Sequence, residues 1–317
     1  MAGLPATMTF EGVSFAAGSF EQLYTSFLTH IQVPQGCSPF NPDMLDEPSA
    51  GMAALWLRAA FHDVGKYDPT SSQGIAAGLL PSFLNQTENS GIGKSIATRF
   101  APQAVFPYST ADYVVLGAQV TLSHCGGPQF DFLRGRIDAP RSTKFTDLPA
   151  LPDDQNDSYH VIKQKLQRLG FNNQDIVALV TGSHSLGGVH KAISPQSTNQ
   201  TFEAFAWYCN IALDPELRPI VQLYANDQAA FFTQYQESFQ KMTTLGQDRS
   251  KLVSLHMNIA VHSNLFAEGT VGASTPTPGQ AVATSIAKAT STVVPSTKSG
   301  AVVLSFGVSY LISLFAI

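Results

Sequence analysis

Arg58 and His62 are spaced so that their side chains could act together. On a helix, residues four apart share a face, so the guanidinium and the imidazole would lie side by side. An imidazole can take up and release a proton near neutral pH, and a guanidinium supplies fixed positive charge. The neighbours between Trp56 and Phe61 are apolar, and ionisable groups in apolar surroundings are costly unless they are paired or used. A solvated surface pair is the alternative for this spacing.

A second histidine, His184, follows an apolar segment that is predicted to be helical and to run into Gly182. Gly187 and Gly188 come shortly after it. Glycines beside a histidine let a flat ligand or another backbone segment approach closely. The alternative is a buried histidine whose ring is satisfied by the backbone.

The elements that must position these residues are predicted to be helices. Apolar residues recur at helical spacing in six segments, which are 20–31, 52–62, 112–123, 159–169, 175–181 and 226–245. In the last segment the residues on one face are Phe231, Phe232, Tyr235, Phe239 and Met242. Glycine and proline clusters separate the segments, and no set of alternating strands is visible. The body of the chain is therefore predicted to be one large all-α domain.

Composition narrows the function classes. Charged residues make up 13% of the 317 residues, and the net charge is −5, which argues against a nucleic-acid binder because such proteins show a basic patch or stripe. The hydrophobic fraction of 44% excludes disorder of the whole chain. Three cysteines exclude a small disulfide scaffold and leave one possible bridge and one further thiol.

The C-terminal part differs in composition from the body. Between Val271 and Gly300 the only charged residues are Lys288 and Lys298, and 11 of the 30 positions are Ser or Thr. We interpret residues 268–300 as a disordered stalk. The apolar run 301–317 is predicted to be a GPI-attachment signal, with a transmembrane tail anchor as the alternative.

These features predict an extracellular, GPI-anchored glycoprotein at the cell surface, attached to a membrane through its C-terminus. Three sequons, at Asn85, Asn156 and Asn199, are compatible with this interpretation. The N-terminal segment 1–17 has neither a basic region nor an unbroken apolar run, as a signal peptide would have. Export is then either unconventional or directed by a start that lies further upstream, and we favour the upstream start. Residues 18–267 then form the main domain.

The two histidine segments together resemble the haem peroxidases of the plant, fungal and bacterial superfamily. An Arg-x-x-Phe-His segment is followed about 120 residues later by Gly-Ser-His-Ser-Leu-Gly, a combination far more specific than either part. Further matching segments in the family's order are Ala111-Asp112, Leu116-Gly117-Ala118, Cys125-Gly126-Gly127-Pro128-Gln129 and Gly135-Arg136-Ile137-Asp138-Ala139. Phe61 and the cysteine before Gly-Gly-Pro make the chain look like the secreted fungal branch.

The resemblance implies an all-α fold, a haem peroxidase-like bundle of about ten helices in two halves with haem b between them. His184 would be the axial ligand of the haem iron, and Phe61 and Ser185 would lie at the haem. The family's aspartate partner of this histidine is missing, so the role goes to Glu203, or to Tyr208 in an alternative alignment.

On the other side of the haem, the resemblance assigns catalysis to Arg58, His62 and Asn89. His62 would move the proton of iron-bound peroxide, Arg58 would supply charge, and Asn89 would accept a hydrogen bond from His62. The implied reaction reduces hydrogen peroxide through a ferryl intermediate and oxidises a small organic donor, in a monomer. The alternative is a haem-binding or scaffold protein at the cell surface with little or no turnover.

Calcium is doubtful, because the family's distal calcium loop is altered. Asp63 is present, but Ala77 and Leu79 stand where the family has a carboxylate and a hydroxyl, and calcium needs six to eight oxygens. We therefore expect no tightly bound calcium. The resemblance also implies a disulfide between Cys37 and Cys125, which leaves Cys209 as a free thiol.

Overall fold

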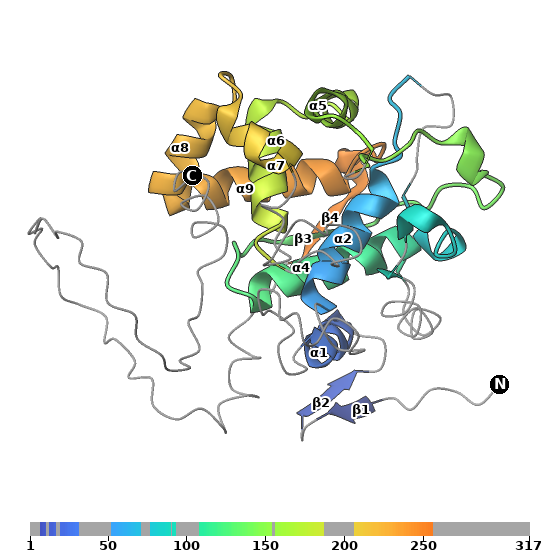
Figure 1. The fold of residues 1–317 in the computed structure, drawn as a ribbon. Coiled ribbons are helices and arrows are strands. Elements are labelled where there is room, and N and C mark those ends of the chain that lie inside the picture. Colours follow the sequence, from blue (N-terminus) through green and yellow to red (C-terminus); the bar gives the residue numbers. More distant parts are fainter. Residues whose placement is uncertain are drawn as a thin grey trace, which may run out of the picture. The chain divides into compact units, whose positions relative to one another are not determined.

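Eight α-helices make up most of the chain that the computed structural model describes (Figure 1). The described residues are 7–10, 13–16, 20–31, 52–70, 77–89, 91–92, 108–153, 156–186 and 206–255, and all of them belong to the larger of the chain's two units. The helices are α1 Phe20–Ile31, α2 Met52–Val64, α4 Thr110–His124, α5 Tyr159–Arg168, α6 Asn173–Ser183, α7 Ala206–Leu213, α8 Arg218–Asn226 and α9 Gln228–Thr243. The prediction of an all-α fold is confirmed.

The helix boundaries follow from side chains that cap the first turns. Ser109 accepts a hydrogen bond from the backbone N–H of Asp112 at the start of α4, at 3.0 Å. Asn172 and Asp175 form a reciprocal capping box at the start of α6. The segment predicted as one helix over 226–245 is divided, because Asp227 leaves the helical conformation and caps α9 through the N–H of Ala230.

Within the described residues there are four short strands that the sequence did not predict. β1 Thr7–Phe10 pairs antiparallel with β2 Val13–Ala16, and β3 Phe132–Arg134 pairs antiparallel with β4 Val253–Leu255. Strands of three or four residues are too short to show a clear alternation of apolar and polar side chains. The helices α7 and α8 were also not predicted. Four 3₁₀ turns lie between the larger elements: η2 Leu80–Ser82, η3 Thr87–Asn89, η6 Phe145–Asp147 and η8 Arg249–Lys251.

The helix α2 packs against α4 through a close approach at one glycine. A Cβ atom on Gly117 of α4 would lie 2.4 Å from the indole ring of Trp56, so only glycine lets the ring reach the α4 backbone. Phe27 of α1 meets the edge of the same indole, with ring centroids 4.9 Å apart. Trp56 is fully buried, as expected for a core residue. This packing fixes the helix that carries Arg58 and His62.

The helix α6 is held against α9 by apolar packing and one buried carboxylate. Phe231, Tyr235, Phe239 and Met242 of α9 are buried, which confirms the face that was predicted, whereas Phe232 is half-buried. Asp175 of α6 accepts hydrogen bonds from Ser238 at 2.7 Å and from Lys241 at 2.6 Å. The helix that leads to His184 is thereby anchored at its first turn.

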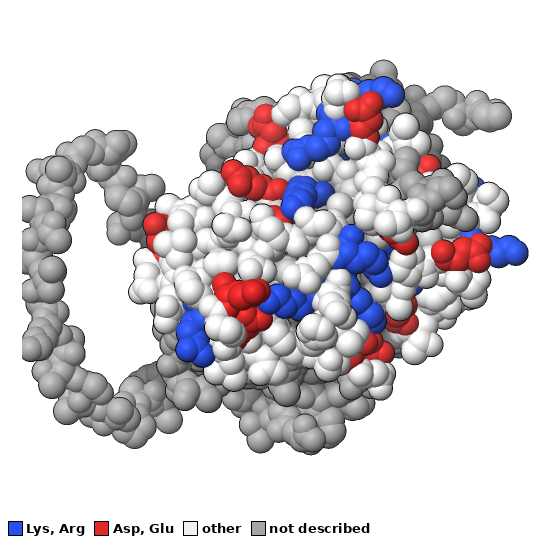
Figure 2. Space-filling view, turned by 90° about the horizontal axis from the view of Figure 1, so that it is seen from above, with Lys and Arg blue, Asp and Glu red and all other residues white. Residues whose placement is uncertain are grey.

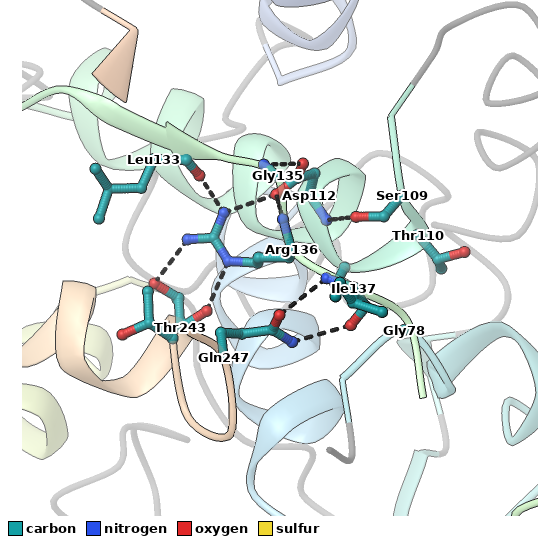
Figure 3. Close-up of polar contacts among 12 residues, drawn as sticks. Gly78, Ser109, Thr110, Asp112, Leu133, Gly135, Arg136, Ile137, Thr243 and Gln247 are labelled. Carbon is teal, nitrogen blue, oxygen red and sulfur yellow. Dashed lines mark hydrogen bonds and ion pairs between the residues drawn. The ribbon is translucent and has the colours of Figure 1, made fainter. Parts of the chain in front are cut away.

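A buried ion pair ties α4 to the segment after β3 (Figure 3). Arg136 Nη1 lies 2.9 Å from the Asp112 carboxylate, and both side chains are 2% exposed. The carboxylate also accepts the N–H groups of Gly135, at 2.7 Å, and of Arg136, at 3.2 Å. The guanidinium donates further to the carbonyl oxygens of Leu133 and Thr243. All polar side-chain atoms of Asp112 and Arg136 therefore have hydrogen-bond partners, as a buried ion pair requires.

The same segment is also clamped to the turn after α9 (Figure 3). The side-chain amide of Gln247 accepts the N–H of Ile137 and donates to its carbonyl oxygen, both at 2.9 Å. One residue further, the Asp138 carboxylate accepts the N–H groups of Thr110 and Ala111 at the start of α4. The motif 135–139 therefore joins the first turn of α4 to the C-terminal end of α9.

Charges of both signs are mixed on the described surface. Figure 2 shows basic and acidic residues next to each other, separated by uncharged areas, on the face that it displays. Among the described residues, Lys163 Nζ lies 2.8 Å from Asp214 and 2.9 Å from Glu216.

Candidate active site

His62, the predicted proton acceptor, lies on α2 with a defined ring orientation. His62 Nδ1 is 2.7 Å from the side-chain oxygen of Asn89, which belongs to η3. The amide nitrogen of Asn89 donates to the carbonyl oxygen of Phe83 at 2.8 Å, so the amide oxygen is the atom that faces His62. Nδ1 of a neutral ring must then carry the proton, which leaves Nε2 as the proton acceptor.

Burial keeps the ring of His62 neutral. It lowers the pKa of His62 to about 3, and the charges of Arg58 and Lys66 act in the same direction, while the hydrogen bond with Asn89 opposes them. At neutral pH the ring is therefore able to accept a proton. Arg58, the other residue of the pair, donates from Nη2 to the carbonyl oxygen of Glu88 at 2.9 Å. It is exposed, and it lies one turn before His62 on the same helix.

Asp63, the residue after His62, accepts hydrogen bonds from backbone N–H groups. Its carboxylate accepts the N–H of Gly78 at 2.7 Å and that of Leu80 at 2.9 Å. Burial raises the pKa of Asp63 to about 6, and these hydrogen bonds oppose the rise. The side chain fastens the 77–80 turn to the end of α2, so the residue that the family uses for calcium has backbone partners here.

The second histidine, His184, follows directly after α6. Its N–H donates to the carbonyl oxygen of Val180 at 3.2 Å, so it continues the last turn of the helix. Burial lowers the pKa of His184 to about 4, and a neutral imidazole is the form that binds a metal. Ser185 donates to the carbonyl oxygen of Thr181 at 3.0 Å.

Tyr235 of α9 packs directly against the residues that precede His184. Its hydroxyl lies 3.0 Å from the Ser183 hydroxyl, and a Cβ on Gly182 would lie 2.4 Å from its ring. Sequence reasoning placed Tyr235 on the buried face of its helix but not at this site. Gly182 is thus required for close packing with another side chain of the protein.

The remaining predicted site residues are less fully described. Phe61 is half-buried, and its ring meets that of His62 at 77° with centroids 6.2 Å apart. Glu203 lies outside the described residues, and so does the side chain of Tyr208. Cys125 is disulfide-bonded, but Cys37 and the side chain of Cys209 lie outside the described residues, so its partner stays a prediction.

Two residues near His62 were missed by sequence reasoning, Lys66 and Glu88. The Nζ of Lys66 lies 3.0 Å from the Glu88 carboxylate, and Lys66 is only 5% exposed. Its position four residues after His62, continuing the Arg58–His62 spacing, was the available signal. Within the described residues, no group of three or more His, Cys, Asp or Glu residues could hold a metal ion by itself.

The side chains of His184, His62 and Arg58 have the chemical properties expected of residues that bind haem and activate peroxide. A haem iron needs a single neutral imidazole from the protein on one side, and His184 can supply it. On the other side peroxide needs a proton acceptor beside a fixed positive charge, and His62 and Arg58 have these properties.

Comparison with known proteins identifies the class. The family model described as peroxidase matches residues 43–271, and the chain therefore belongs to the haem peroxidase family. It is a peroxidase, an oxidoreductase that uses a haem cofactor, hydrogen peroxide and an electron donor.

The chain is similar to several plant and fungal enzymes of this class. It is 31% identical to L-ascorbate peroxidase 3 of Arabidopsis thaliana over 218 residues, which cover 61% of this chain and 74% of the relative. It is 32% identical to cytosolic L-ascorbate peroxidase 1 of Oryza sativa subsp. japonica, with 61% and 86% covered. It is 26% identical to the mitochondrial cytochrome c peroxidase of Candida albicans, with 73% and 71% covered. The expected likeness to the secreted fungal branch is not confirmed.

The predicted location at the cell surface is wrong. The similar proteins are named as cytosolic, peroxisomal or mitochondrial peroxidases. The prediction relied on the composition of residues 268–317, and Ser/Thr-rich and apolar segments are not specific to one destination. Those residues lie outside the described part of the chain. In the part that is described, no helix has the length and apolar character needed to cross a membrane.

Proposed function

We propose that His62, Arg58 and Asn89 form the group that activates hydrogen peroxide, and that His184 is the haem iron ligand. The observation that carries the proposal is the hydrogen bond of 2.7 Å between His62 and Asn89 together with the neutral state of the imidazole. Haem b, when bound, would supply the iron at which the O–O bond of peroxide is broken, and it would hold the two oxidising equivalents that peroxide delivers until the donor reduces it.

The proton moves through His62. Its Nε2 would accept a proton from bound hydrogen peroxide and would return it to the departing oxygen, which would leave as water. Asn89 keeps the proton of the ring on Nδ1 throughout, so that the acceptor always faces the substrate. Arg58 stabilises the negative charge that develops on the departing oxygen.

We further propose that residues 18–267 form the peroxidase domain, that it works as a monomer, and that its donor is a small organic reductant. The similar proteins with the higher identity are named L-ascorbate peroxidases, whereas the cytochrome c peroxidase is less similar. We expect no tightly bound calcium at Asp63, since its carboxylate already accepts two N–H groups. Steady-state assays with ascorbate and with reduced cytochrome c test the donor, and a preference for cytochrome c would refute the small-donor proposal.

Reconstitution with haem tests the site. The full chain is loaded with haem, and its absorption spectrum is followed in a stopped-flow instrument after mixing with peroxide. We expect a Soret band that changes on mixing, loss of haem retention in His184→Ala, and a rate lowered by about 10²- to 10⁴-fold in His62→Leu. His160→Ala is the matched control, because this exposed histidine contacts only Gln164 among the described hydrogen bonds.

Two results would overturn the assignments. Haem retention by His184→Ala at the wild-type level would exclude His184 as the ligand. A wild-type rate in His62→Leu would exclude His62 as the proton acceptor. A Soret band that never responds to peroxide in the wild-type chain would favour a haem-binding protein without turnover.

A further inference from the structure

Lys66 is a buried cation next to the distal histidine. It lies in the turn after α2, and its Nζ contacts the Glu88 carboxylate at 3.0 Å and the carbonyl oxygen of Pro149 at 3.1 Å. The same ammonium group lies 4.1 Å from the ring centroid of Phe145. A lysine that is 5% exposed needs such partners, because an isolated buried charge is strongly unfavourable.

Glu88 connects this lysine to the catalytic group. Its carboxylate contacts Lys66, its carbonyl oxygen accepts from Arg58 at 2.9 Å, and the next residue, Asn89, is hydrogen-bonded to His62. Two consecutive residues of η3 therefore contact three side chains that are spaced four residues apart along and just beyond α2. Lys66, His62 and Asn89 also line one small pocket, together with apolar residues of η2 and its neighbours.

We propose that the Lys66–Glu88 ion pair holds η3 against α2 and thereby positions Asn89 on His62. Lys66 and Glu88 are positioning residues, since neither needs to touch peroxide. Besides the pair, the hydrogen bonds seen between η3 and α2 in the described residues include those of Arg58 with the Glu88 carbonyl and of Asn89 with His62. This inference rests on the proposed role of His62 as proton acceptor.

The charge of Lys66 also acts on His62 directly. The pKa of His62 is lowered most by burial, less by the charge of Arg58 and least by the charge of Lys66. Other charged groups on α2, or packed against it, have hydrogen-bond or ion-pair partners of their own. Asp63 accepts N–H groups of Gly78 and Leu80, Glu88 pairs with Lys66, and Asp112 of α4 pairs with Arg136. On the side of α6 and α9, the buried His184 and Tyr235 are neutral near pH 7.

Two substitutions separate a positioning role from general stabilisation. Lys66→Met removes the cation and leaves Glu88 half-buried, whereas Glu88→Gln keeps the backbone carbonyl that Arg58 uses. We expect both substitutions to slow the peroxide reaction of the haem-loaded protein by roughly tenfold. This is the lower end of the range of losses seen when a residue that orients a functional side chain is removed. Lys66→Arg should restore most of the rate. Lys163→Met, which breaks an ion pair on α5, is the matched control and should leave the rate unchanged.

A second measurement does not depend on activity. The full chain is loaded with zinc protoporphyrin, a diamagnetic substitute for haem, and the ring ¹⁵N signals of His62 are followed by NMR as the pH is lowered. In Lys66→Met the loss of the cation raises the pKa of His62, but the loss of the Asn89 hydrogen bond lowers it, so the two effects oppose each other. In Glu88→Gln the cation remains and the Asn89 hydrogen bond is weakened, so the midpoint should move to lower pH. Circular dichroism confirms that each variant is folded, and Glu88→Gln carries the test if Lys66→Met does not fold.

Wild-type rates in both variants, or an unchanged midpoint in Glu88→Gln, would overturn the inference. Equal losses in Lys163→Met would show a general effect on stability and would overturn it as well. Failure of the proposed function is distinguishable, because His62→Leu would then react as fast as the wild type. The midpoint in Glu88→Gln would still decide whether the Lys66–Glu88 pair positions Asn89 on His62.

Discussion

Breaking the buried Asp112–Arg136 pair should destabilise the whole domain. Asp112→Asn removes the negative charge and leaves a guanidinium that is almost fully buried. Arg136→Met removes the cation and leaves a carboxylate that still accepts the N–H groups of Gly135 and of residue 136. The pair also joins α4 to Thr243 at the end of α9, so either change weakens a contact between distant parts of the chain.

The magnitude follows from burial. Removing one partner of a buried pair costs about 3–5 kcal/mol, because the other charge is left without compensation. Arg136→Met should lie near the lower end, since two N–H groups remain on the carboxylate, and Asp112→Asn near the upper end. For a domain of this size each kcal/mol lowers the melting temperature by about 2–4 °C, so the expected loss is roughly 6–20 °C.

A double-mutant cycle measures the coupling. Thermal and urea unfolding of the two single variants and the double variant are followed by circular dichroism, with Lys251→Met as the control for an exposed pair worth less than about 1 kcal/mol. The double variant should be more stable than the sum of the single losses predicts, by about 0.5–3 kcal/mol. Strict additivity, or single losses no larger than that of Lys251→Met, would refute the reasoning.

Three further predictions concern the site and its support. Gly182→Ala should destabilise the protein by about 1–3 kcal/mol and weaken haem retention, because its methyl group would overlap the Tyr235 ring; unchanged melting and haem titration curves would contradict this. The peroxide rate should stay constant on acidification until the pH approaches about 3, the pKa of His62, because only the neutral ring accepts a proton; stopped-flow rates that fall in step with an ordinary histidine near 6.5 would contradict it. Peptide mapping without reduction should join Cys125 to Cys37, and Cys125→Ser should then cost roughly 4 kcal/mol of stability in urea unfolding, whereas a bridge to the third cysteine would disprove the pairing.

The sequence predicted the helices well where apolar residues recur at helical spacing. Five of the six predicted segments correspond to single helices, with bounds within a few residues of those observed. The sixth, 226–245, differs because Asp227 caps α9, which begins only at Gln228, while Asn226 is the last residue of α8. The β3–β4 pairing was not predictable, since Leu133 and Ser254 are neighbours only after the chain between them has folded.

The site was predictable only in part. Arg58 and His62 share a helix face, so their spacing reveals them, but His62 and Asn89 are 27 residues apart and only the family resemblance suggested their contact. The sequence did not distinguish Lys66 from a surface lysine, because the burial of its side chain depends on η3 and on the loop that carries Pro149. Composition alone misled the prediction of cellular location.

The contacts of Arg136 also constrain how the protein can be made. Its partner Thr243 lies 107 residues later, and the clamp between Ile137 and Gln247 spans 110 residues. While the ribosome is still extending the chain, the guanidinium and the first turn of α4 have no such partners, and contacts this distant in sequence form slowly. The contacts of the segment 135–139 with the end of α9 are therefore completed only after α9 has left the exit tunnel. Nascent chains halted before residue 243 should remain sensitive to protease and dependent on chaperones, and should become resistant once Gln247 has emerged.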